Sequence, residues 1–149
     1  MLIETFDEAR SAILFAIAEM QSQDREYLLK NKCSCFVIQL LMNYLPTDQR
    51  TKLAHILMEA EDEEKAVKLM KDLIIDANGS RSLEVMIRSA SDANVNKFFK
   101  SVVLEKLGEY ASNPRSNYVV QMFLSRVTDK TLVRVWWEFH RRWKRRSRS

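Results

Sequence analysis

The sequence predicts an all-α protein built as an α-solenoid, and three observations lead to this prediction. The 149 residues contain only two glycines and two prolines, which is little turn material for a fold of many short strands. Leu, Met, Lys and Glu, which favour helices, are abundant. A pattern of apolar residues at helical spacing also recurs three times, which is typical of stacked helical repeats.

The length and composition favour one soluble, intracellular domain. A chain of 149 residues, 46% of them hydrophobic, can bury one core. No apolar run approaches the length of a membrane span, and the acidic start MLIETFDEAR does not resemble a secretory or mitochondrial leader. We therefore expect no membrane partner.

The cysteines and histidines do not form a ligand pattern. Cys33 and Cys35 are too close in sequence for an ordinary disulfide. His55 and His140 have no metal-ligand spacing, so the sequence predicts reduced, packed thiols, no metal site and no cofactor.

The repeat becomes visible when three nonapeptides are aligned: SCFVIQLLM (34–42), GSRSLEVMI (79–87) and SNYVVQMFL (116–124). The second and third copies follow at offsets of 45 and 37 residues. Apolar side chains coincide at two positions, which are Ile38, Leu83 and Val120, and Leu41, Met86 and Phe123. Three copies of one helical unit explain this match, although an ordinary helical bundle with a chance alignment remains the alternative.

Each unit is expected to hold a short helix, a central helix carrying the nonapeptide, and a closing helix. A helix over residues 6–20 would close a partial repeat (1–22), and the full repeats would cover about 23–60, 61–103 and 104–139. The short helices are expected at about 25–29, 66–75 and 104–111. Thr47, Asp92 and Asp129 are plausible N-caps of the closing helices. Those helices should bury Leu53 and Leu57, Phe98 and Val102, and Val135 and Phe139.

Charge is divided unevenly along the chain, whose net charge is +4. The final segment HRRWKRRSRS (140–149) carries six cations and no acid, namely Arg141, Arg142, Lys144, Arg145, Arg146 and Arg148. The other 139 residues hold 18 cations and 20 acids, a net −2. We interpret the segment as a phosphate-binding tail or a nuclear localisation signal, with an inert solvated terminus as the alternative. The acidic EAEDEEK (59–65) is expected to be an exposed loop or helix start that accommodates the longer offset.

Three positions of the nonapeptide do not suit a buried core. The second, third and sixth residues are Cys35, Phe36 and Gln39; Ser80, Arg81 and Glu84; and Asn117, Tyr118 and Gln121. The second and sixth residues lie one helical turn apart and include a hydrogen-bonding group, while the third is planar. This combination suits a nucleobase, whose edge meets polar atoms and whose face stacks on a planar side chain.

These segments resemble the Pumilio-repeat (PUF) RNA-binding proteins, in which SNYVVQ is close to a signature. ASNPRSNYVVQMFLSRV, DANGSRSLEVMI and NKCSCFVIQLLMNYL look most like the nucleolar branch of that family, the nucleolar protein nine-like proteins of small-subunit ribosomal RNA maturation. The resemblance covers about residues 6–139, with fewer repeats than family members carry. It implies a right-handed α-solenoid of Pumilio-type three-helix repeats, a nuclear and nucleolar location, and ribosomal precursor RNA and ribosome-assembly proteins as partners.

The resemblance also implies a role for each triplet. In this family the second and sixth residues read the base edge, the third residue stacks, and the repeats run antiparallel to the RNA. The triplets of the first, second and third repeats resemble adenine, guanine and uracil readers, which predicts 5′-UGA-3′. Glu84 suits guanine because a carboxylate accepts from the N1 and N2 protons together, whereas the thiol of Cys35 is a poor hydrogen-bond partner.

The sequence therefore predicts a module that binds single-stranded RNA, with about one base contacted per repeat. The alternative is a helical-repeat adaptor that binds protein without base readout. No phosphate loop, nucleophile arrangement or metal-ligand cluster indicates an enzyme or a small-molecule substrate.

Overall fold

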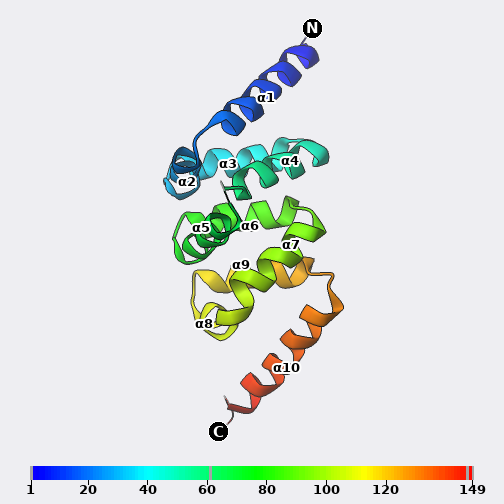
Figure 1. Ribbon diagram of the computed structural model, residues 1–149. Coiled ribbons are helices and arrows are strands. Elements are labelled where there is room, and N and C mark those ends of the chain that lie inside the picture. The colour runs from blue at the N-terminus through cyan, green and yellow to red at the C-terminus, as the bar shows by residue number, and fades with distance from the viewer. Residues whose placement is uncertain (1, 61, 147, 149) are drawn as a thin grey trace.

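The computed structural model describes residues 2–60, 62–146 and 148, with side chains from residue 5 onward. Every regular element within these residues is helical, and the helices stack in chain order along one axis, with α1 and α10 at opposite ends (Figure 1). The predicted all-α solenoid is confirmed.

The helices group into three units of similar design. The first comprises α2 (Ser22–Lys30), α3 (Ser34–Tyr44) and α4 (Thr47–Met58). The second comprises α5 (Glu63–Ile75), α6 (Gly79–Ser89) and α7 (Asp92–Phe98), extended by the π-helical turn η1 (Phe99–Val103). The third comprises the 3₁₀ turn η2 (Leu104–Lys106), α8 (Leu107–Ser112), α9 (Ser116–Arg126) and α10 (Lys130–Arg146). The central helices α3, α6 and α9 each have 11 residues.

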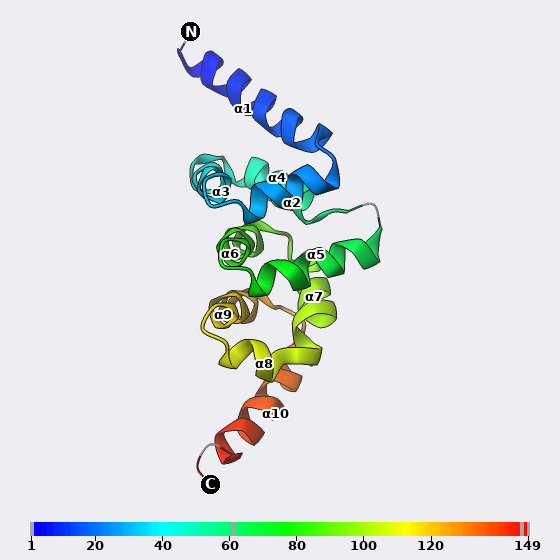
Figure 2. The same cartoon turned by 90° about the vertical axis from the view of Figure 1, so that its left-hand side faces the viewer.

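A further helix, α1 (Leu2–Glu19), precedes these units and tilts away from the stack (Figure 2). It packs against α4, and Ile17 is its one buried side chain among those that the structure describes. In the described part of the chain, no helix has the length and apolar content required to cross a bilayer.

The same turn leads into the central helix in every unit. It is an Asx turn, in which the side-chain oxygen of an Asn or Asp accepts hydrogen bonds from the backbone N–H groups two and three residues later. The acceptors are Asn31, Asp76 and Asn113, with N···O distances between 2.6 and 3.4 Å. All three have extended backbone, with ψ of 135°, 139° and 130°. The chain therefore changes direction in the same way before each central helix.

The first residue of each central helix is adapted to this turn. The hydroxyls of Ser34 and Ser116 donate to the carbonyls of Leu28 and Tyr110, each over 2.8 Å, and so tie the central helix to the end of the short helix. Gly79 occupies this place in the second unit, where a Cβ atom would lie 2.8 Å from a methyl group of Leu73. A side chain there would displace the core.

The aligned apolar positions form the core, although Leu41 and Phe139 are only partly buried and one predicted residue lies outside the core. Ile38, Leu83, Val120, Met86 and Phe123 are buried, as are the predicted pairs on α4 and on α7 with η1. The prediction for α10 was wrong for Val135, which is exposed. That helix packs through Leu132, Trp136 and Phe139, so Val135 lies one residue off the packing face.

Two of the three predicted N-caps are displaced by one residue. Thr47 and Asp92 are the first helical residues of α4 and α7, and the capping positions belong to Pro46 and Ser91. Asp129 directly precedes α10, and its carboxylate accepts from the N–H of Thr131 over 2.8 Å, as an N-cap does.

The difference between the 45-residue and 37-residue offsets of the nonapeptides has a structural cause. Glu59, Ala60 and Asp62, which lie between α4 and α5, are not helical, and Asp62 caps α5 by accepting from the N–H of Lys65 over 2.8 Å. In contrast, residues 92–112 are helical without interruption, because η1 and η2 join α7 directly to α8. The sequence interval between the second and third central helices is therefore shorter than the interval between the first and second.

Replacing Asp76 tests the Asx turn. Asp76→Ala removes the acceptor for two backbone N–H groups and should lower the free energy of unfolding by about 1–2 kcal/mol, measured by urea denaturation. Asp76→Asn keeps the acceptor oxygen used in the other two units and should change stability by less than about 0.5 kcal/mol. If both variants are equally unstable, the charge of Asp76 and not its acceptor oxygen supports the turn.

Candidate nucleic-acid interface

The central helices bring equivalent residues into line. α6 packs against both α3 and α9, and Figure 2 shows the three helices one above another. Because each follows the same turn and has the same length, the sixth-position residues Gln39, Glu84 and Gln121 occupy equivalent places on successive helices. Gln121 is exposed, and Gln39 and Glu84 are partly exposed. Of the six predicted edge-reading residues, the three at the sixth position are therefore accessible.

The planar third-position residues lie at the surface. Phe36 is 50% exposed and Tyr118 is 60% exposed. Arg81 is also exposed. Each central helix thus presents a planar side chain close to its sixth-position residue.

The second-position residues are less accessible. Cys35 and Ser80 are buried, with the thiol of Cys35 3.3 Å from the carbonyl of Lys32 and the hydroxyl of Ser80 3.4 Å from that of Ala77. Asn117 is partly exposed, but its Oδ1 atom is buried and has no hydrogen-bond partner among the described residues. The structure therefore brings the third and sixth positions to the surface and leaves the second position mostly inside.

Glu84 lies between two arginines on α6. Burial, the largest influence, raises the pKa of the Glu84 carboxyl above its ordinary value, whereas Arg88 and Arg81 oppose the rise by favouring the carboxylate. Arg88 lies one helical turn beyond Glu84 and was not among the predicted site residues. Its spacing of four residues from Glu84 was a signal that sequence reasoning could have used.

The basic segment is an extension of α10. That helix continues without a break through Arg146, so most of the cations of residues 140–149 project from a helix. Arg141, Arg142 and Arg145 are exposed. On another side of α10 the rings of Trp136, Phe139 and Trp143 follow one another, with centroids 6.3 and 6.1 Å apart. Trp137 does not join this row and is 54% exposed.

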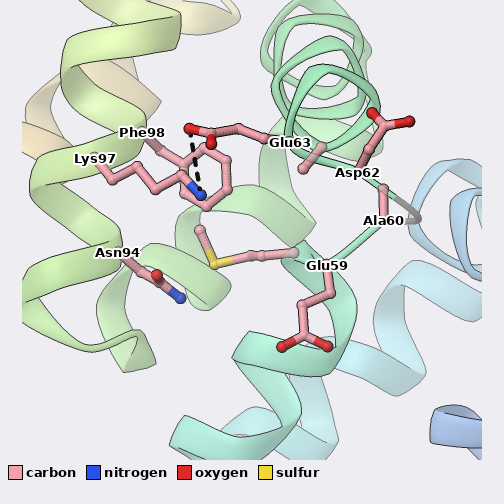
Figure 3. Close-up of a pocket in the computed structure, with 9 residues that line it drawn as sticks. Glu59, Ala60, Asp62, Glu63, Asn94, Lys97 and Phe98 are labelled. Carbon is pink, nitrogen blue, oxygen red and sulfur yellow. Dashed lines mark ion pairs between the residues drawn. The ribbon is translucent and has the colours of Figure 1, made fainter.

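A separate hollow lies where α4 ends and α5 begins, beside α7 (Figure 3). Glu59, Asp62 and Glu63 make its rim acidic, and Lys97 pairs with Glu63 over 3.5 Å. An acidic rim repels phosphate, so this hollow is unsuited to nucleic acid. Within the ranges that the structure describes, no three His, Cys, Asp or Glu side chains are grouped to hold a metal ion.

The Asx residues were also missed at the sequence level. Asn31, Asp76 and Asn113 each lie three residues before the first residue of an aligned nonapeptide, in the pattern Asn/Asp-x-x-Ser/Gly. Extending the alignment upstream by three residues would have revealed them, together with the cause of the common register.

The environment of Glu84 predicts its titration. In an NMR pH titration, Glu84 should take up its proton at a higher pH than an ordinary glutamate, because burial disfavours the carboxylate. Arg88→Gln should raise the pKa of Glu84 further, since it removes a nearby positive charge, whereas Lys100→Gln on η1 should leave it unchanged. A lower pKa in the Arg88→Gln variant would contradict this electrostatic account.

Comparison with known proteins places the chain among repeat proteins. A family model described as the NOP9-like PUF repeat domain matches residues 3–148. Relatives named Nucleolar protein 9 from Arthroderma benhamiae, Arthroderma gypseum and Blastomyces gilchristii are 36%, 35% and 32% identical over 72 residues. That stretch is 48% of this chain and 10% or 11% of each relative, and no solved structure matches the chain. Since the family model matches nearly the whole chain, the protein belongs to the NOP9-like PUF repeat domain family.

Proposed function

We propose that the protein binds single-stranded RNA along α3, α6 and α9, with about one base contacted per repeat, and that it acts as a binding module and not as an enzyme. The natural target in this proposal is ribosomal precursor RNA in the nucleolus, with ribosome-assembly proteins as further partners. Support comes from the family match and from relatives named Nucleolar protein 9.

One observation carries the proposal. Three stacked helices of equal length each present a hydrogen-bonding side chain at the sixth position and a planar side chain at the third, and none of these six residues is buried. Because the exposed face of an amphipathic helix is ordinarily polar, the discriminating feature is the planar side chain that accompanies the hydrogen-bonding side chain in all three units. Polar atoms beside exposed planar groups suit bases that are splayed out and stacked.

The sixth position carries most of the edge readout in this proposal, because Cys35 and Ser80 are buried. Gln39 folds back on its own helix, where its Nε2 atom donates to the carbonyl of Cys35 over 3.1 Å. This hydrogen bond leaves the amide oxygen of Gln39 available to accept from the exocyclic amine of adenine. Asn117 would expose its unpartnered Oδ1 atom by rotating, and the N3–H of uracil would then supply a donor.

A second function is favoured by a different surface. A hollow between α1 and α3 is lined by Arg10 of α1 and by mostly apolar side chains at and just beyond α3, namely Val37, Leu40, Leu41, Tyr44 and Leu45. Val37, Leu40 and Tyr44 are more than half exposed, at 54%, 55% and 80%. Such a patch is typical of a protein contact, so the adaptor function applies to this end of the stack.

Glu84 should determine preference for guanine at the middle base. In anisotropy measurements with fluorescent RNAs at one fixed salt concentration, Glu84→Gln should reduce the preference for UGA over UAA by about 1–3 kcal/mol, as expected when a bidentate base contact is removed. Glu64→Gln, on the outer helix α5, removes the same charge and should leave the preference intact.

The same preference should depend on pH. Lowering the pH protonates Glu84 and turns one of its two acceptor oxygens into a donor, so the carboxyl can no longer accept from both N1–H and N2–H of guanine. The raised pKa of Glu84 places this change at a higher pH than for an ordinary glutamate. The Glu84→Gln variant should lack the pH dependence. Equal affinity of the unmodified protein for UGA and UAA at neutral pH would rule out readout by Glu84.

The α10 cations and the stacking residues should act differently. Arg141→Gln, Arg142→Gln and Arg145→Gln, made together, should weaken binding to all RNAs and flatten the log–log salt slope by roughly 0.7 for each phosphate that is no longer neutralised. These replacements keep α10 intact, including the contact of Trp143 with Phe139.

Tyr118→Ala should weaken binding by about 1–3 kcal/mol with little change of that slope, because stacking is not ionic. Tyr118→Phe keeps the ring and should bind almost as tightly as the unmodified protein. If the α10 replacements abolish discrimination between RNA sequences while Tyr118→Ala has no effect, the central helices are not the interface.

A further inference from the structure

A basic hollow lies where the three units meet, one helical turn beyond Glu84 on α6. Its lining residues are Thr47, Arg50, Thr51, Arg88, Ser89, Ala90 and Arg126. The arginines come from α4, α6 and α9, one from each unit. The hollow has a volume of about 370 Å³, and of its lining residues Ala90 alone is apolar.

Arg126 links α9 to the end of α6 and so fixes the wall of this hollow. Its guanidinium donates to the carbonyls of Ile87 over 2.9 Å and Ala90 over 2.8 Å, and also to the carbonyl of Arg88. It further pairs with Asp92 over 3.2 Å. These bonds fix the last residue of α9 against the end of α6, so Arg126 is a structural element of the hollow.

The same contacts change the electrostatics of this helix end. The carbonyls at the C-terminus of a helix carry partial negative charge and would repel an anion. Here Arg126 donates to three of them, and the hydroxyl of Thr51 lies within hydrogen-bond distance of two carbonyls, a fourth one at this helix end, that of Ser89, at 2.9 Å, and that of Thr47 at 3.0 Å. The α6 terminus is thereby neutralised.

Arg50 and Arg88 keep donors for a ligand. Arg50 makes one hydrogen bond, to the hydroxyl of Thr47 over 3.0 Å, and a guanidinium has five N–H donors. Arg88 is exposed, and its side chain makes no hydrogen bond within the part of the chain that the structure describes. Two guanidinium groups beside hydroxyls suit the planar, bidentate recognition of a phosphate.

We propose that this hollow binds a backbone phosphate of the RNA, next to the base that Glu84 contacts. The inference rests on the proposed RNA-binding function and adds a sequence-independent anchor to it. Arg88 joins the two sites, since it neighbours Glu84 on α6 and also lines the hollow. The polar lining favours a phosphodiester over a protein partner, whose interface core would need apolar contacts.

The test compares single charge removals on the same fold. Arg50→Gln, which lies away from Glu84, should lower the affinity for UGA and UAA RNAs by the same factor, and Arg50→Gln and Arg88→Gln should each reduce the log–log salt slope, by up to roughly 0.7. Lys52→Gln, an exposed charge on α4 that does not line the hollow, should change neither quantity. Arg126→Gln is unsuitable because it would disrupt the end of α6.

A chemically modified RNA locates the contact. Replacing one phosphodiester near the guanine with a neutral methylphosphonate should weaken binding to the unmodified protein, and should weaken binding of Arg88→Gln by a smaller factor, since the two changes share a contact. Additive effects at every phosphate position, or variants that behave like Lys52→Gln, would overturn the inference while leaving RNA binding by the central helices intact.

Inorganic phosphate separates failure of this site from failure of the proposed function. Phosphate, compared with chloride at equal ionic strength, should shift the NMR signals of the Arg50 and Arg88 side chains. If no RNA binds but phosphate shifts these signals, the proposed function is wrong and the anion site stands. If phosphate shifts no signals and neither Arg50→Gln nor Arg88→Gln changes RNA affinity, the site is not an RNA phosphate site. The same conclusion holds if a glutamate-rich peptide displaces phosphate from the site more readily than RNA does.

Discussion

Hydrogen bonding at the helix ends is the constraint on which this structure depends. A helix leaves N–H groups unpaired at its start and carbonyls unpaired at its end, and short helices have many such ends. The Asx turns satisfy the N–H groups before each central helix. Across units, Asn78 donates to the carbonyl of Lys30 over 2.9 Å and Ser82 to that of Leu29 over 3.0 Å, while Arg126 satisfies the end of α6. Apolar packing holds the stack together, but these directional bonds fix its register, and the register places Gln39, Glu84 and Gln121 in line.

The terminal helices α1 and α10 bury a smaller share of their described side chains than the central helices α3, α6 and α9 do, and their surfaces differ accordingly. Units of a solenoid bury their apolar faces only against neighbours, so a terminal helix has one face without a partner. Among described side chains, Ile17 on α1 and Leu132 on α10 are the only buried residues of these helices. Large apolar side chains remain exposed on both, including Phe15 and Trp137. The ends of the described chain therefore present exposed apolar and basic surface, whereas the central helices present an aligned set of side chains.

The sequence predicted the parts of the fold that periodicity controls. Three central helices, their buried positions and the acidic connection after α4 followed from spacing alone, because core burial imposes a helical period on the residue pattern. The errors occur where packing is incomplete or where one residue decides the geometry. Val135 was misplaced because α10 has few neighbours to define its inner face, and the N-caps at Thr47 and Asp92 were off by one residue because helix ends depend on local turn chemistry. For the candidate site, spacing located the accessible third and sixth positions. It could not show that Cys35 and Ser80 are buried or that Arg50, Arg88 and Arg126 meet, because these depend on contacts between units.

The position of Glu84 raises a physical problem that the structure resolves. A carboxylate that faces RNA repels the phosphate backbone, and partial burial makes its charged form less favourable. Arg81 and Arg88 flank it on the same helix and favour the charged form, so the carboxylate can remain ionised in a partly dry site. Guanine is the base that suits this carboxylate, because its N1–H and N2–H₂ groups together offer two donors to the two carboxylate oxygens. In the proposed complex Arg81 and Arg88 would therefore have two roles. They favour the ionised form of Glu84, and they would supply positive charge for the RNA backbone on either side of the base. On α6 a carboxylate can thus take part in the proposed interface without leaving a net negative charge there.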